Sequence, residues 1–291
     1  MHHMKTFNFT LILFFISSMT SACAQKKEVI IKTHKLTDKI YMLEGQGGNI
    51  GISTGEDGVF MIDSQFAPLT PKILDAIKTL SDKPIKYLAN THHHGDHTGG
   101  NENISKLNAP IIAHDNVYKR VKNNPKQSDA SLPVITFNDK LSLYINGEQV
   151  IIFHIDNAHT DGDALLYFTK SNVLHTGDTY FNGRYPYIDL KSGGTVNGYI
   201  KAIKSAMIFV DDNTKIIPGH GKQSNKQEYT TFLNMLETLK NKVETEISNG
   251  KTEDEVVSNT NLTKTYDDLN YGCCYISSEK MRRTLYRSLK R

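Results

Sequence analysis

One stretch of the chain, residues 85–97, decides the fold, and it reads Ile85-Lys-Tyr-Leu-Ala-Asn-Thr-His-His-His-Gly-Asp-His97. Its first five residues form a short apolar run that predicts a buried β-strand. Two residues later come four histidines and an aspartate around a glycine. A strand that runs into a group of metal-ligating side chains indicates a site built at the edge of a sheet.

The spacing within this stretch separates its side chains into two groups. Alternate side chains on a loop leaving a strand point the same way, so His92 and His94 can bind one cation while His93 points elsewhere. The glycine that follows allows a turn, which lets Asp96 and His97 face a second cation. Imidazole nitrogen together with carboxylate oxygen suits zinc, or less selectively iron or manganese. The sequence therefore predicts a site for two cations.

Three further candidate ligands follow predicted strands elsewhere in the chain: His159 after 150–155, Asp178 after 173–175 and His220 after 215–217. Ligands that arrive from separate strand ends would converge on one edge of a sheet. A single histidine after a strand is more often a polar loop residue than a ligand, and that interpretation suits His34, His114, His154 and His175. The larger set is different, because its members gather in glycine-flanked loops at strand ends.

The rest of the chain alternates short strands with helices, in two roughly similar halves. Asn146-Gly147 is a strong turn signal and predicts a hairpin between the strands on either side. Ser224 with Gln227 predicts a capping box that opens a long helix. No linker or repeat interrupts this order, so we expect residues 25–291 to form a single α/β domain.

The ordered set of motifs resembles the metallo-β-lactamase superfamily. In chain order it comprises Asp63, His92-x-His94-x-Asp96-His97, His159, Asp178 and His220, and it extends over residues 47–221. The resemblance implies a four-layer αβ/βα sandwich, in which two mixed sheets lie face to face with helices outside and the site at one edge. These motifs are specific for fold and metal and say little about the substrate.

The resemblance also implies a role for each of these residues. Two zinc ions would be bound by two sets of three side chains, His92, His94 and His159 for the first ion and Asp96, His97 and His220 for the second. Asp178 would bridge the ions, and Asp63 would hydrogen-bond the metal loop without binding metal. Two such metals give a metal-bound hydroxide at neutral pH. Asp96 would also orient the attacking water.

The N-terminal residues have the pattern of a secretory signal peptide. Lys5 precedes the apolar run 7–16, and small residues follow it, so we expect residues 1–24 to be removed on export. Two cleavage sites stay open, because Ala22-Cys23-Ala24 fits the general signal peptidase and Ser21-Ala22-Cys23 resembles a lipobox that would leave Cys23 lipidated. We therefore expect a periplasmic protein or a membrane-anchored lipoprotein, with no transmembrane helix in the mature chain.

The bridging position helps to separate the hydrolases of this superfamily. An aspartate such as Asp178 resembles thioesterases of the glyoxalase II type and lactonases, whereas one β-lactamase subclass has cysteine there. Export, together with residues 47–49 and 63–66, resembles the periplasmic β-lactamase-like branch, since β-lactam antibiotics act in the periplasm. We expect hydrolysis of a β-lactam-like cyclic amide, with a lactone or thioester as the alternative. A mononuclear iron persulfide dioxygenase is a third hypothesis, which predicts iron in the purified protein.

Composition narrows the range of partners. The chain has 291 residues and a formal net charge of +3. This weak positive balance argues against nucleic acid, because phosphate binding needs a concentrated basic face. We therefore expect a small-molecule substrate. Three cysteines are too few for a disulfide framework, and we expect the adjacent Cys273 and Cys274 not to form a normal disulfide and to be structural.

Substrate contacts are expected in residues 45–48, in Phe66 and in the segment 180–194, because loops near a site often carry function. That segment contains two cations, Arg184 and Lys191, either of which would pair with a substrate carboxylate.

Overall fold

The structure of the chain is a computed structural model that describes residues 1–3 and 28–290. Residues 4–27 and 291 lie outside the described residues. The predicted signal-peptide run and Cys23 fall on that part of the chain, so export and lipidation stay predictions.

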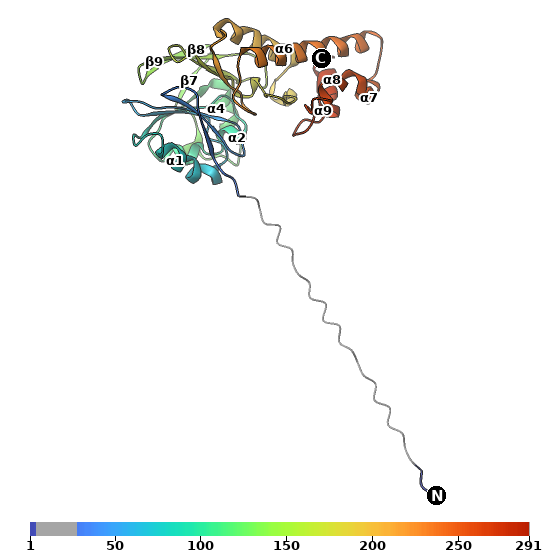
Figure 1. Cartoon of the computed structure of the whole chain (residues 1–291), viewed down its shortest axis with the longest axis horizontal. Helices are drawn as coiled ribbons and strands as arrows, with labels where there is room; N and C mark the ends of the chain where they lie inside the picture. The colour runs from blue at the N-terminus through green and yellow to red at the C-terminus, as the bar shows by residue number, and fades with distance from the viewer. Residues whose placement is uncertain (4–27, 291) are drawn as a thin grey trace.

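Two mixed sheets form the centre of the molecule (Figure 1). The first has seven strands in sequence order: β1 Lys32–Lys35, β2 Ile40–Glu44, β3 Ile50–Ser53, β4 Val59–Ile62, β5 Ile85–Ala89, β6 Ile111–His114 and β7 Ile135–Phe137. Strands β1 to β4 pair antiparallel, and β4 to β7 pair parallel. Because β4, β5 and β6 run in parallel, their carboxyl ends meet at one edge.

The second sheet has five strands in the order β12-β11-β10-β9-β8. They are β8 Lys140–Ile145, β9 Glu148–His154, β10 Ala164–Phe168, β11 Val173–His175 and β12 Lys215–Ile217. Strands β8 and β9 form the predicted hairpin across Asn146-Gly147, both of which have positive φ, as a tight two-residue turn requires. Strands β11 and β12 are parallel, so their carboxyl ends also lie together.

Helices cover the outer faces. The first half contributes α1 Thr70–Lys78, α2 Gly95–Thr98, α3 Asn101–Ser105 and α4 Asp115–Lys122, and the second half α5 Val196–Ala206, α6 Lys226–Ser248, α7 Glu253–Ser258, α8 Lys264–Asp267 and α9 Ser278–Leu289. In Figure 1, α1 and α6 lie on opposite sides of the pair of sheets, and α7, α8 and α9 lie together near the C-terminus. No helix in the described ranges is long and apolar enough to cross a membrane.

Alternation along the strands builds three apolar layers. Met42 of β2 packs between the sheets, in a cluster that includes Phe60 and Phe168, whereas its neighbour Leu43 faces α1 on the outer side. A third cluster lies between the second sheet and α5, α6 and α9. The layers are therefore helix, sheet, sheet and helix, as the resemblance implies.

One detail of the long helix differs from the prediction. Helix α6 is capped by Asn225, whose side chain accepts a hydrogen bond from the Glu228 backbone N–H. Ser224 instead donates to the Glu228 carboxylate and is buried. Serine and asparagine have similar N-cap propensities, so the sequence alone does not distinguish them. Because the Ser224 hydroxyl is hydrogen-bonded to the Tyr180 hydroxyl, Asn225 is the residue that caps the helix.

Candidate metal centre

The seven predicted metal ligands converge from strand ends of both sheets. His92 and His94 follow β5, and Asp96 and His97 lie in α2, which the same loop opens. The remaining three come from the second sheet, with His159 between β9 and β10, Asp178 after β11 and His220 after β12. We call His92, His94, Asp96, His97, His159, Asp178 and His220 the ligand cluster.

The first group of donors has the arrangement of a metal site. His92, His94, His159 and Asp178 each offer one ligand atom, and these atoms all lie within 4.8 Å of one another. His159 Nε2 lies 2.9 Å from His94 Nδ1. His92 Nε2 is buried and has no hydrogen-bond partner among the described residues. A buried nitrogen without a partner is costly, which a bound cation at this point would relieve.

The second group lies on the other side of Asp178. The ligand atoms of Asp96, His97 and His220 also lie within 4.8 Å of one another. Asp96 Oδ2 is 3.3 Å from His220 Nε2 and 3.8 Å from His97 Nε2. His97 Nε2 is buried without a hydrogen-bond partner in the described part of the chain. Imidazole and carboxylate donors fit zinc, iron or manganese at both groups.

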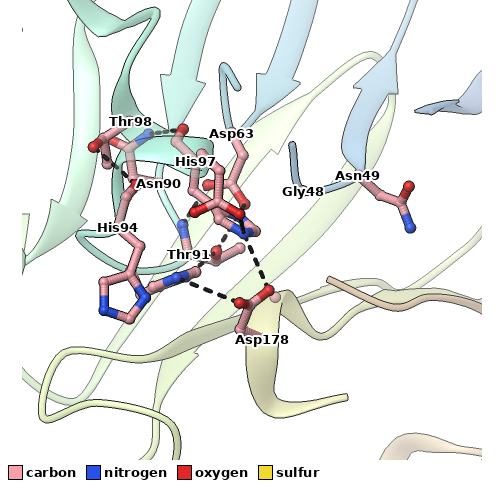
Figure 2. Close-up of polar contacts among 12 residues, drawn as sticks. Gly48, Asn49, Asp63, Asn90, Thr91, His94, His97, Thr98 and Asp178 are labelled. Atoms are coloured by element: carbon pink, nitrogen blue, oxygen red, sulfur yellow. Dashed lines mark hydrogen bonds and ion pairs between the residues drawn. The ribbon is translucent and has the colours of Figure 1, made fainter. Parts of the chain in front are cut away.

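Asp178 reaches both groups with its two carboxylate oxygens. Its Oδ2 lies 3.8 Å from His92 Nε2 and 3.5 Å from His159 Nε2, and it is also 3.4 Å from His220 Nε2. Its Oδ1 lies 3.0 Å from His97 Nε2. Figure 2 shows Asp178 on a loop of the second sheet, with its carboxylate directed toward His97 of the first half. This geometry suits a carboxylate that bridges two cations.

Asp63 lies behind His97 and holds it in place. The carboxylate is fully buried and accepts hydrogen bonds from the Thr91 backbone N–H at 2.8 Å and hydroxyl at 2.7 Å. Its Oδ2 also lies 2.7 Å from His97 Nδ1, on the side of the ring away from Asp178 (Figure 2). A histidine whose Nδ1–H is fixed in this way presents Nε2 to a metal. The geometry matches the supporting role that the resemblance implies.

Two glycines allow the close approach of backbone to this cluster. A Cβ at Gly48 would collide with the His97 ring, and a Cβ at Gly219 would collide with the Asp178 carboxylate. Both positions therefore require the smallest residue, which explains why glycines flank the motifs.

Asp189 is a supporting residue that the sequence did not reveal. Its Oδ2 lies 3.1 Å from His94 Nε2, and its Oδ1 accepts from the backbone N–H groups of Lys191 and Ser192. The bond to Nε2 leaves Nδ1 of His94 as the atom facing His159. His93 is not part of the ligand cluster. Its ring lies near Asp189 and the Nε2 side of His94. The only signal for Asp189 was its place in the segment 180–194.

The charges of the cluster follow from burial and from Asp178. Burial lowers the pKa of His92 well below its ordinary value and that of His159 to about 4, so both are neutral at pH 7. Burial alone would lower the pKa of His220, but Asp178 outweighs it and raises the pKa to about 9. Cation binding at that histidine must displace a proton, which makes metal affinity depend on pH.

A cavity of about 610 Å³ opens over the ligand cluster. Of the three residues predicted to contact substrate, Phe66 and Arg184 line it, and Lys191 is not among the described residues that do. Lys191 is exposed, and its backbone N–H instead donates to Asp189. The far wall comes from a segment that the sequence did not single out, and it contributes Cys274, Tyr275 and Ile276.

The prediction for the adjacent cysteines was wrong. Cys273 and Cys274 are joined by a disulfide between neighbouring residues. The segment that carries them connects α8 to α9, and both cysteines are exposed.

A family model described as the metallo-β-lactamase superfamily matches residues 43–243. The chain belongs to this superfamily. The match confirms the predicted family and fold, and with them the enzyme class, a metal-dependent hydrolase.

Curated relatives of this chain include hydroxyacylglutathione hydrolases. The protein from Pelagibacter ubique is 34% identical over 158 residues, which cover 52% of this chain and 59% of that protein. The protein from Nitrosococcus oceani is 28% identical over 149 residues, which cover 50% of this chain and 52% of that protein. The chain thus spans little more than half the length of these relatives.

Solved structures resemble the chain in fold. A metallo-β-lactamase from Pontibacter korlensis has a TM-score of 0.63 at 18% identity, and the match covers 71% of this chain and 99% of that one. A sec-alkylsulfatase from a Pseudomonas species has a TM-score of 0.69 at 17% identity, covering 89% of this chain and 50% of that one. At such low identity these likenesses establish the fold alone.

Proposed function

We propose that the protein is a di-zinc hydrolase of acyl thioesters, with lactones and other activated esters as related substrates. The observation that carries this proposal is Asp178, a carboxylate within 3.8 Å of histidines in both donor groups. The first donor group comprises His92, His94 and His159, and the second comprises Asp96, His97 and His220.

The relatives support a thioester in preference to a β-lactam. The curated matches described above carry the name hydroxyacylglutathione hydrolase, and their substrate is the acyl thioester of a thiol. Our expectation of β-lactam cleavage has support only from structures below 25% identity, which speak for the fold. The alternative from the sequence therefore becomes the main proposal.

Two zinc ions, when bound, would supply Lewis acidity and activate a water nucleophile at neutral pH. The chain prepares their site by keeping His92 and His159 neutral through burial. Burial would raise the pKa of Asp96, but His97 and a hydrogen bond with His220 outweigh it and lower the pKa, so Asp96 stays ionised. Because Asp96 also lines the cavity, its carboxylate can accept a hydrogen bond from water and orient it toward the acyl carbon.

The cavity indicates the shape of the substrate. Its walls include several aromatic side chains, among them Phe66, Phe181 and Tyr187. Arg184 lines the same cavity and has no ion pair with any acid of the described residues. An apolar acyl or thiol group that carries a carboxylate would match both features, since a guanidinium binds carboxylate with directed hydrogen bonds.

A substrate panel tests this proposal. The zinc-loaded protein is assayed with S-acyl thioesters, lactones and a chromogenic cephalosporin, each with and without chelator. We expect chelator-sensitive thioester hydrolysis, with kcat/KM at least about a hundredfold above that for the cephalosporin. A cephalosporin rate that exceeds every thioester rate contradicts the proposal. Iron in the purified protein, with oxygen consumption on a persulfide, would favour the dioxygenase hypothesis.

We also propose that the hydrolase acts outside the cytoplasm, on the strength of the signal-peptide pattern in residues 1–24. Mass spectrometry of the protein from a bacterial host is the test. A new N-terminus at Gln25 or a lipidated Cys23 supports export, and an intact N-terminus in the cytoplasmic fraction contradicts it.

A further inference from the structure

The disulfide of adjacent cysteines is placed at the mouth of the catalytic cavity. Cys274 lines the cavity together with Tyr275 and Ile276, and the same cavity is bounded by His94 and Asp96 of the ligand cluster. Cys273, its partner in the disulfide, belongs to the preceding turn, where its N–H donates to the Asn270 carbonyl. Cys274 of the pair therefore borders the cavity.

The segment on either side of the disulfide is held firmly. The Tyr185 N–H donates to the Tyr271 carbonyl at 3.1 Å, and Ile276 is buried. Asp267 Oδ1 accepts from the Tyr185 hydroxyl at 2.7 Å and from the Ser278 hydroxyl at 2.6 Å. These contacts tie the segment to Tyr185, which is itself a cavity wall. The residues on both sides of the disulfide are therefore held in place by contacts with the rest of the domain.

The segment also contacts residues beside the metal ligands. The Tyr275 ring packs edge-on against Tyr187, with ring centroids 5.5 Å apart. Tyr187 stacks on His94 at 5.6 Å, and its carbonyl lies 2.7 Å from His159 Nδ1. A group attached to Cys274 would therefore lie over the ligand cluster and obstruct it.

Two cations lie on residues close to the disulfide segment, Lys280 beside Tyr275 and Arg184 in the cavity wall. Lys280 Nζ lies 5.1 Å from the Tyr275 ring centroid and donates to the Tyr275 carbonyl. Arg184 lines the cavity and has no acidic partner among the described residues. Such a field raises the local concentration of anions, including thiolates and thiols that carry an acid group.

We propose that the Cys273–Cys274 disulfide is a thiol-exchange site, at which a thiol held in the catalytic cavity becomes attached to Cys274. The attacking thiol loses its proton, and its thiolate attacks Cys274 Sγ along the sulfur–sulfur bond. A new disulfide forms between the thiol and Cys274 as the Cys273–Cys274 bond breaks. The electron pair leaves on Cys273 Sγ, which takes up a proton, so no external oxidant or reductant is needed.

This exchange deepens the proposed function, because thioester hydrolysis releases a thiol in the cavity and the exchange would make that product an inhibitor. The chemistry itself needs only a thiol and an accessible disulfide. An exposed disulfide meets the second condition, since exchange depends on access to the attacked sulfur.

Peptide mapping of the full chain tests the exchange. The protein is incubated with 2-mercaptoethanesulfonate, or with 2-mercaptoethanol as the uncharged counterpart, then quenched in acid and labelled with a maleimide. We expect the thiol on Cys274 and the maleimide on Cys273. Per thiolate, the sulfonate should react about tenfold faster than 2-mercaptoethanol, and Arg184→Gln should reduce that preference. A sample without added thiol, carried through the same quench and maleimide labelling, serves as the control.

Turnover of a thioester is measured on the same samples. We expect the rate to fall in proportion to the fraction of Cys274 that carries the thiol. The proposal is overturned if both cysteines are free thiols at the start, if no adduct forms, if the adduct is on Cys273, or if full modification leaves turnover unchanged. A protein that forms the Cys274 adduct but hydrolyses no thioester would contradict the proposed function and leave the exchange site standing.

Discussion

The catalytic cavity has two walls of different origin. The inner wall is the ligand cluster, which is polar, largely buried and supplied by loops that follow strands and by the short helix α2. The outer wall, which we call the rim, comprises Phe66, Arg184, Tyr187, Cys274, Tyr275 and Ile276. Half of the rim residues are aromatic, and the first and last of its segments lie more than 200 residues apart in the chain. The inner wall determines the chemistry, and the rim determines which molecule reaches it.

The largest effect is expected from removing the carboxylate shared by the two donor groups. Asp178→Ala should lower kcat/KM by about a thousandfold or more, because both cations lose a ligand. Metal analysis should find fewer than two zinc ions per chain. Asp75→Ala, an exposed aspartate of α1, is the matched control and should keep full activity. Two retained zinc ions with normal turnover in Asp178→Ala would contradict the role of Asp178 as a ligand shared by both cations.

A smaller effect is expected from the support behind the inner wall. Asp189→Asn removes the charge that lies 3.1 Å from His94 Nε2. Zinc affinity should fall about 10- to 100-fold, as for other residues that orient metal-binding histidines. Competition with a fluorescent chelator measures the affinity. His93→Gln is the control, and a larger loss there than in Asp189→Asn would place the metal outside the ligand cluster.

The strand that leads into Asp178 should also lose stability in acid. His175 is fully buried in β11, and burial lowers its pKa to about 4. An unfolded histidine titrates near pH 6.5, so the unfolded state binds more protons between about pH 6.5 and 4. Stability is therefore present above pH 6.5 and is lost as the pH falls through this window.

Urea denaturation in excess chelator measures that loss. Between pH 7 and pH 4.5 the free energy of unfolding should fall about 2 kcal/mol more in the wild-type protein than in His175→Gln. An equal pH dependence in the two proteins would show that His175 is not the group that titrates.

The smallest effect belongs to the rim. Arg184→Gln should raise KM about tenfold for a thioester that carries a carboxylate and leave kcat nearly unchanged, because the guanidinium contacts a part of the substrate that does not react. Lys191→Gln should change neither constant, since Lys191 lies away from the cavity-lining residues described. An uncharged thioester should respond to neither substitution. A fall in kcat with Arg184→Gln would contradict this prediction, because it would mean that a rim residue contributes to the reaction step.

The inner wall was predictable because each of its ligands lies next to a strand signal. The apolar run at 85–89 positions His92, His94, Asp96 and His97 within a few residues, and the chain direction of parallel strands brings the others to the same edge. Asp189 could not be found in this way, because its contact with His94 spans 95 positions.

The rim was not predictable for a related reason. Arg184 and Lys191 are both cations of one loop, and only the path of the backbone decides which side chain faces the cavity. Cys274 reaches the cavity because Asp267 and Tyr271 fix the α8–α9 segment against Tyr185. These are long-range contacts without a local sequence pattern.

Crystallography of the zinc-loaded protein, with anomalous scattering measured on both sides of the zinc edge, tests the central claim most directly. The account predicts two zinc peaks, one among His92, His94 and His159 and the other among Asp96, His97 and His220, with Asp178 in contact with both. A single peak, or a peak among His93, His94 and Asp189, would contradict it.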